Sequence, residues 1–243
     1  MKLNADLGES YGNWQHNHDA DIMPYIDMAN VACGYHAGDA LTMQKTIELA
    51  KLYGVVIGAH PSYPDLQGFG RRSMRIPAQE LGAMLHAQLA TLDGMAKCQQ
   101  TQIGYVKPHG ALYNDMMRNL DIFEDVVAAM ASFYVRLPLM IQALADREPY
   151  QEIANKYQIE LLFEAFADRR YTDRGFLQAR SFPNSVLNNE QTLEQAVMLI
   201  TEGQVLTDAG THIMLKADTI CVHGDNPEAL SVVQKIRQML NGK

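Results

Sequence analysis

The chain has 243 residues, of which 47% are hydrophobic and 20% charged, a composition typical of a globular protein with a sizeable core. The formal net charge of −8 and the lack of any basic stripe argue against nucleic-acid binding. No apolar run reaches the roughly 18 residues of a membrane span, and the opening residues become polar too soon for a signal peptide. We therefore expect a cytoplasmic protein without a membrane partner.

No linker, charge block or low-complexity tract divides the sequence, so we expect a single domain over residues 1–243. The three cysteines are Cys33, Cys98 and Cys221, and their spacing fits neither a zinc site nor a thioredoxin-like motif. Reduced thiols are expected.

The first predicted strand covers residues 2–7, where apolar and polar side chains alternate. Period-two alternation puts Asn4 and Asp6 together on one face, with Glu9 just beyond the strand. These polar groups could belong to a ligand site, or the acids could only satisfy amides of the following loop.

Four strand-like apolar runs each lead into a histidine beside glycine or proline, namely His36, His60, His109 and His223. Lys107 emerges from the same run as His109. Because active residues of barrel enzymes gather at the C-terminal ends of the strands, these side chains predict one shared site.

Two loops carry a doubled arginine after a predicted strand. Arg71 and Arg72 end the long loop over residues 60–72, and Arg169 and Arg170 follow the strand over residues 159–166. In an acidic protein such pairs could bind a carboxylate or phosphate, or they could be solvated surface.

Further strands are predicted over residues 103–106, 137–141 and 219–222, and an irregular hairpin over 205–215. Helices are predicted over 77–98, 121–133, 147–157 and 190–200, with a last one starting near 225. Asp39 is placed to cap another helix, whose spacing directs Leu41, Met43, Ile47, Ala50 and Leu52 toward one face. Strand and helix alternate about seven times, which predicts a parallel α/β barrel.

Six long motifs resemble the LamB/YcsF family and together cover nearly the whole chain. They are residues 3–10, 30–39, 58–61 with 68–72, 107–113, 164–171 and 218–225. The resemblance implies a distorted seven-stranded parallel barrel, TIM-barrel-like and related to polysaccharide and chitooligosaccharide deacetylases.

The resemblance also implies a cytoplasmic enzyme component that acts with two partner subunits, of B and C type. Together they would open the lactam of 5-oxo-L-proline to L-glutamate while ATP becomes ADP and phosphate. No G-x-x-x-x-G-K-[ST] sequence is present, so this chain need not hold ATP alone. Self-association into a homo-oligomer stays open.

Amide resonance makes a lactam carbonyl a poor electrophile, so phosphorylation of its oxygen would activate the ring. Opening the ring then needs a base, a cation near the phosphate and a donor for the departing nitrogen. The candidate catalytic residues are Asp6, His36, His60, Lys107 and His109. Candidate residues for binding substrate or phosphate are Asn4, Glu9, Arg71, Arg72, Arg169, Arg170 and His223.

Two other functions fit the same residues. A metal-dependent, carbohydrate deacetylase-like hydrolase would hold a divalent metal on ligands chosen from Asp6, His36, His60 and His109. A non-catalytic component would only bind the anionic cyclic amide and deliver it to its partners.

Overall fold

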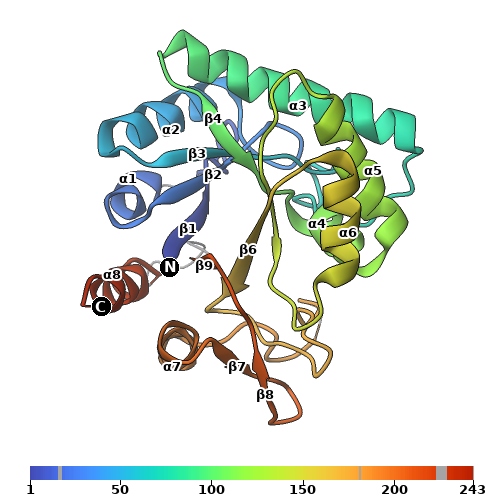
Figure 1. Cartoon of the computed structure of the whole chain (residues 1–243). Helices are drawn as coiled ribbons and strands as arrows, with labels where there is room; N and C mark the ends of the chain where they lie inside the picture. Colours follow the sequence, from blue (N-terminus) through green and yellow to red (C-terminus); the bar gives the residue numbers. More distant parts are fainter. Residues whose placement is uncertain (16–17, 181, 223–228, 243) are drawn as a thin grey trace.

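The computed structural model describes residues 1–15, 18–180, 182–222 and 229–242. Seven parallel strands close into a barrel, as Figure 1 shows, which confirms the predicted fold class. In order around the barrel these are β1 (Lys2–Leu7), β2 (Met28–Ala32), β3 (Val56–His60), β4 (Ile103–Val106), β5 (Leu139–Gln142), β6 (Leu161–Phe166) and β9 (Thr219–Cys221).

Helices surround the barrel on its outer face (Figure 1). They are α1 (Asp19–Ile22), α2 (Ala40–Tyr53), α3 (Ala78–Cys98), α4 (Gly110–Arg118), α5 (Leu120–Ser132), α6 (Glu148–Tyr157), α7 (Asn189–Thr201) and α8 (Ala229–Asn241), with a 3-10 turn η1 (Met23–Tyr25). The predicted hairpin is the antiparallel pair β7 (Gln204–Leu206) and β8 (His212–Met214). Within the described ranges, no helix combines the length and apolarity that crossing a membrane requires.

The barrel is distorted on the side of β4. The pairing of β3 with β4 shifts register between Ile57 and Gly58, and β4 meets β5 through the single pair Val106 and Leu139. A side chain at Gly58 would collide with the ring of Tyr105, since an added Cβ would stand 2.1 Å from it. Glycine there lets Tyr105 reach into the barrel.

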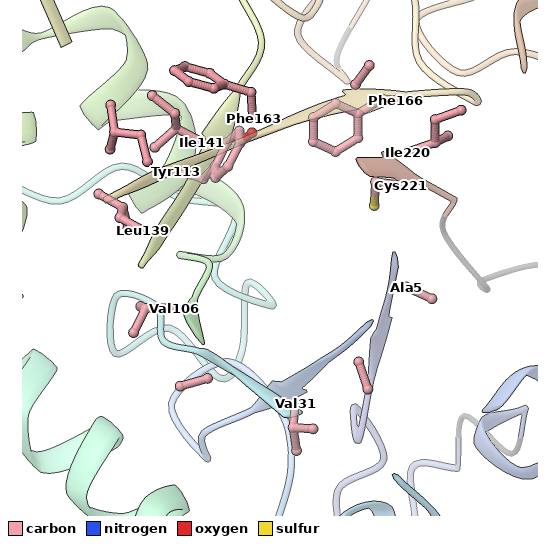
Figure 2. Close-up of a cluster of buried hydrophobic side chains, with 14 of the residues drawn as sticks. Ala5, Val31, Val106, Tyr113, Leu139, Ile141, Phe163, Phe166, Ile220 and Cys221 are labelled. Carbon is pink, nitrogen blue, oxygen red and sulfur yellow. The ribbon is translucent and has the colours of Figure 1, made fainter. Parts of the chain in front are cut away.

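Alternation along the strands separates two environments. Outward residues such as Ala5, Val31, Ile141 and Ile220 pack into the core between barrel and helices (Figure 2). Inside the barrel, a separate apolar cluster of Met28, Tyr105, Met140 and Leu162 lies toward the strand beginnings. Polar side chains fill the rest of the interior, and this arrangement places the site at the strand ends.

Helix α2 confirms one expectation and corrects another. Asp39 caps it, because its Oδ1 accepts a hydrogen bond of 2.8 Å from the amide of Thr42. Leu41 and Leu52, however, are 58% and 74% exposed, so their expected inward orientation is wrong. Each lies two residues from a buried position, which turns it about 200° around the helix.

Helix α4 was not predicted from the sequence, where Pro108 indicates the end of a strand and Gly110 permits a turn. The helix buries Leu112 and Met116 against the core and directs Arg118 toward the barrel mouth.

Candidate active site

A cavity of about 370 Å³ opens at the C-terminal ends of the barrel strands. Asp6 and His60 reach it from β1 and β3, and Lys107 and His109 follow β4 directly. Four of the five predicted catalytic residues therefore share one cavity. The fifth, His36, lies behind His109, with the two rings stacked 3.7 Å apart.

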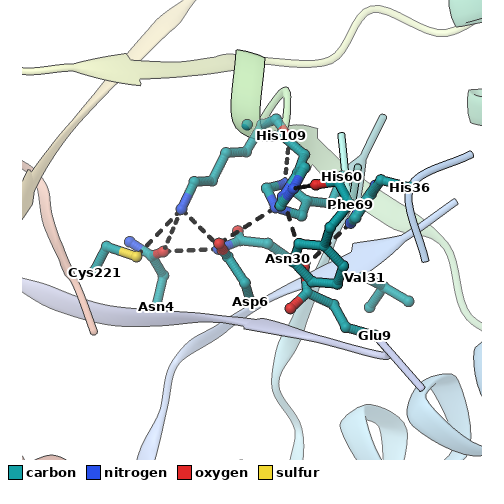
Figure 3. Close-up of polar contacts among 12 residues, drawn as sticks. Asn4, Asp6, Glu9, Asn30, Val31, His36, His60, Phe69, His109 and Cys221 are labelled. Atoms are coloured by element: carbon teal, nitrogen blue, oxygen red, sulfur yellow. Dashed lines mark hydrogen bonds and ion pairs between the residues drawn. The ribbon is translucent and has the colours of Figure 1, made fainter. Parts of the chain in front are cut away.

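Lys107 is the centre of a buried charge network. Its neighbours Asn4, Asp6 and Cys221 are labelled in Figure 3. Its Nζ donates to Asp6 Oδ1 at 2.9 Å and stands 3.0 Å from Glu164 Oε2 and 3.2 Å from Cys221 Sγ. Burial alone would lower the pKa of the Lys107 ammonium, but Asp6 and Glu164 more than offset this and hold that pKa well above its ordinary value. Lys107 is therefore a permanent cation beneath the cavity.

A second set of contacts fixes the orientation of Asp6. Asn30 Nδ2 donates to Asp6 Oδ1 at 2.7 Å and to Asn4 Oδ1 at 2.8 Å, and Tyr105 Oη donates to Asn30 Oδ1 at 2.6 Å. With Oδ1 held by Asn30 and Lys107, the other oxygen, Oδ2, faces His60 Nε2 at 3.3 Å. Asn4, predicted as a binding residue, is fully buried outside the cavity lining and instead supports this network.

The histidine side chains are held by hydrogen bonds that fix their orientation. His60 Nδ1 donates to the carbonyl of Lys107 at 2.6 Å, and His109 Nε2 donates to the carbonyl of Phe69 at 2.9 Å. Their other nitrogens, His60 Nε2 and His109 Nδ1, face each other at 2.9 Å. Burial and then the neighbouring histidines lower the pKa of His36 and of His109 well below the ordinary value, so these two rings are neutral.

The loop after β3 closes over these rings because of two glycines. Gly70 has a φ of +64°, and a Cβ there would stand 2.8 Å from the Cβ of His36 and 2.7 Å from the ring of His109. Its carbonyl accepts from the amide of Ala111 at 2.8 Å, opposite Gly110 with a φ of +55°. Only glycine permits this close approach of backbone to histidine.

The cavity lining also includes four arginines, Arg71, Arg118, Arg169 and Arg180. Arg169 is buried, and its Nη2 donates to the carbonyl of Gln178 at 2.7 Å. Burial, followed by repulsion from Arg180, lowers the pKa of Arg169 to about 10. Mutual repulsion of this kind marks a region of positive potential that an anion would relieve.

Only the first arginine of each predicted pair lines the cavity. Arg72 is 61% exposed and its Nε donates to Asp65 Oδ1 at 2.9 Å, while Arg170 Nε donates to the carbonyl of Asn184 at 3.1 Å. These partners direct both side chains away from the cavity. The remaining predicted binding residue, His223, lies outside the described residues.

Asn30, Tyr105 and Glu164 were not selected from the sequence, although each contacts the predicted residues. A signal was present, because each is a polar group at an inward position of an otherwise apolar strand. Arg118 and Arg180 carried no comparable signal.

A closed parallel barrel with acids, histidines and a lysine around a cavity at its strand ends has the architecture of an enzyme of the barrel class. The model of the LamB/YcsF family matches residues 1–243, and the chain belongs to that family.

Curated relatives match over almost their full length. The A-type 5-oxoprolinase subunit of Vibrio campbellii is 54% identical over 99% of this chain and 95% of its own. The second A-type 5-oxoprolinase subunit of Pseudomonas putida is 48% identical over 100% of this chain and 94% of its own. Among solved structures, the lactam utilization protein of Thermus thermophilus superimposes with a TM-score of 0.89 at 37% identity, over 100% of this chain and 96% of that one.

Proposed function

We propose that this chain works in the cytoplasm as the A-type component of an ATP-dependent 5-oxoprolinase, with two partner subunits of B and C type. The complex would convert 5-oxo-L-proline to L-glutamate while ATP becomes ADP and phosphate. The names and full-length similarity of the relatives support this proposal. The observation that carries it is the cavity itself, whose lining combines arginines with Asp6 and Lys107 and so offers groups for both ends of this substrate.

5-Oxoproline is a five-membered lactam that bears a carboxylate. The lining arginines Arg71, Arg169 and Arg180 would bind the carboxylate or a phosphate through charge-assisted hydrogen bonds. The lactam carbonyl would then face Asp6 and Lys107, which line the same cavity. The cavity volume lies in the range of about 300–1,000 Å³ that is usual for small-molecule sites.

Phosphorylation of the lactam oxygen by ATP would make the ring carbon electrophilic. Water would then add to that carbon, the ring C–N bond would break, and the nitrogen would take up protons as the amine of the product. Hydrolysis of the resulting acyl phosphate would give glutamate and phosphate. We assign to Asp6 Oδ2, beside His60 Nε2, the orientation and deprotonation of the water.

Lys107 has a different role in this scheme. Because its pKa is held well above the ordinary value, it is a poor proton donor and instead stabilises negative charge near Asp6. The departing nitrogen would receive the proton that Asp6 has taken from the water. ATP would be held together with the partner subunits.

The test is 5-oxoproline-dependent ATP hydrolysis, with glutamate formation measured in parallel. The three subunits together should be active, whereas this chain alone and the two partners without it should not form glutamate. Full glutamate formation by the two partners alone would contradict the proposal. Binding of 5-oxoproline by this chain, combined with full activity of an Asp6→Asn complex, would favour a component that only delivers substrate.

A deacetylase-like hydrolase remains the second candidate because of one observation. One possible ligand atom from each of Glu9, His36, His60 and His109 lies within 4.8 Å of the others, so the cluster could hold a metal ion. Release of acetate from acetylated oligosaccharides by this chain alone, dependent on added metal, would favour this candidate over the first.

A further inference from the structure

The positions of the protons on the His60 and His109 rings follow from the hydrogen-bond partners of these rings. A backbone carbonyl can only accept, so His60 carries its proton on Nδ1, toward Lys107, and His109 carries its proton on Nε2, toward Phe69. When both rings are neutral, His60 Nε2 and His109 Nδ1 each present a lone pair, and these atoms are 2.9 Å apart. Two facing lone pairs repel each other, and either a shared proton or a metal ion bound by both nitrogens would relieve this repulsion.

A carboxylate oxygen lies near each of these two nitrogens. Glu9 Oε1 lies 3.6 Å from His109 Nδ1, and Asp6 Oδ2 lies 3.3 Å from His60 Nε2. Two ligands held about 2.1 Å from one ion are separated by about 3.0–3.4 Å for bond angles between octahedral and tetrahedral values. The observed separations fall close to that range, so an ion fits with small shifts of the side chains.

The ring planes decide which histidines can take part. The rings of His60 and His109 are nearly perpendicular, at 86°, and their planes therefore share a line on which one ion can meet both lone pairs. The rings of His36 and His109 are parallel within 4° and 3.7 Å apart, so no ion can lie in both planes. His36 Nε2 instead donates to Glu9 Oε1 at 3.1 Å and orients that carboxylate.

Contact with the cavity also distinguishes His36 from the other residues of the cluster. Glu9, His60 and His109 line the cavity together with Asp6, whereas His36 lies outside the lining. We propose that His60 Nε2, His109 Nδ1 and the Glu9 carboxylate bind a divalent transition-metal ion of the Zn²⁺ and Co²⁺ class, with an open position toward the cavity. His36 positions Glu9, and Asp6 stands beside the open position without being a ligand.

Two imidazoles and one carboxylate form a ligand set that suits such ions, and three protein ligands leave a position for water or substrate. A bound ion of this kind can polarise a carbonyl or lower the pKa of its water. The site rests on geometry alone and is independent of the proposed lactam opening. It also changes the predicted ligand set, because Glu9 replaces His36 and Asp6.

The experiment uses the chain alone, without 5-oxoproline or ATP, so that its outcome is separate from that of the activity assay. Purified protein is stripped with a chelator, and Co²⁺ is added while the visible absorption of the ion and the heat of binding are recorded. One equivalent should bind per chain, and Zn²⁺ should displace it. His60→Gln, His109→Gln and Glu9→Gln should each weaken binding by about 10²-fold or more, and His36→Gln by about 10- to 100-fold.

His86→Gln is the matched control, since His86 lies on α3 outside the cavity lining and its Nε2 donates to the carbonyl of Ala129 on α5, so this variant should bind Co²⁺ like the parent. Circular dichroism establishes that each variant is folded, and Glu9→Gln replaces either histidine variant that is not. The inference is overturned if the parent binds neither ion at micromolar concentration. It is equally overturned if folded His60→Gln, His109→Gln and Glu9→Gln all keep the parental affinity.

Discussion

Two groups of residues that line the cavity are held in different ways, and we call them the rigid wall and the adaptable wall. On the rigid wall, Asp6, His60 and Lys107 lie at strand ends, are almost fully buried and are each bonded to another member of the group. The adaptable wall consists of Arg71 and Arg118, which are exposed and come from a loop and from the end of a short helix, whereas their neighbour in the lining, Arg169, is buried. The groups to which we assign bond making are thus held rigidly, whereas the exposed groups to which we assign recognition of charge have room to adapt.

The largest effect on stability is expected on the rigid wall. Lys107→Met leaves Asp6 and Glu164 without their buried cation, and we expect a loss of about 3–5 kcal/mol in the free energy of unfolding. Urea denaturation monitored by circular dichroism measures it. Lys156→Met, which removes a surface pair with Glu124, is the control and should change stability little. Equal stability of the two variants would show that the buried network is not what stabilises this wall.

The adaptable wall should respond in binding and not in stability. Arg71→Gln should raise the KM for 5-oxoproline by about 10-fold or more, because one charge-assisted contact to the carboxylate is lost. The sequence supplies a matched control next to it. Arg72→Gln should leave KM unchanged, since Arg72 is paired with Asp65 away from the cavity. Steady-state kinetics of the complete complex distinguishes these outcomes, and an equal rise in both variants would remove Arg71 from substrate recognition.

The smallest effect is expected away from both walls, at the cap of α2. Asp39→Ala should cost about 1 kcal/mol in stability at pH 7 and leave turnover unchanged. Hydrogen bonds from the amides of Gly12 and then Thr42 lower the pKa of Asp39 below its ordinary value. Its contribution is therefore complete above about pH 4, the ordinary range of an unfolded Asp, and is lost as pH falls through the lower pKa of the folded protein. A stability difference between variant and parent that grows on acidification would contradict this assignment.

Much of the fold could be predicted from the sequence because its signals are periodic. Alternation identified β1 and its inward residues Asn4 and Asp6, and a long stripe of leucines identified α3. The rule that active residues gather at strand ends brought Asp6, His60 and His109 together without any knowledge of their distances.

Other features depend on side-chain contacts that produce no periodic pattern in the sequence. Neighbouring residues of a loop, such as Arg71 and Arg72, can point in opposite directions, and only the partner of each decides which one faces the cavity. The stacking of His36 on His109 likewise depends on the approach of Gly70 from a separate loop. Burial of Lys107 between two carboxylates could not be predicted from the sequence either, although it decides how a mutation there affects stability.

The most direct test of the difference between the walls is steady-state kinetics of 5-oxoproline turnover by the complete complex carrying Asp6→Asn. This change keeps the size of the side chain and removes its charge, so kcat should fall by about 10²-fold or more while KM changes little. Arg71→Gln in the same assay should raise KM and change kcat little. A folded Asp6→Asn complex with near-parental kcat would contradict the assignment of the chemical step to the rigid wall.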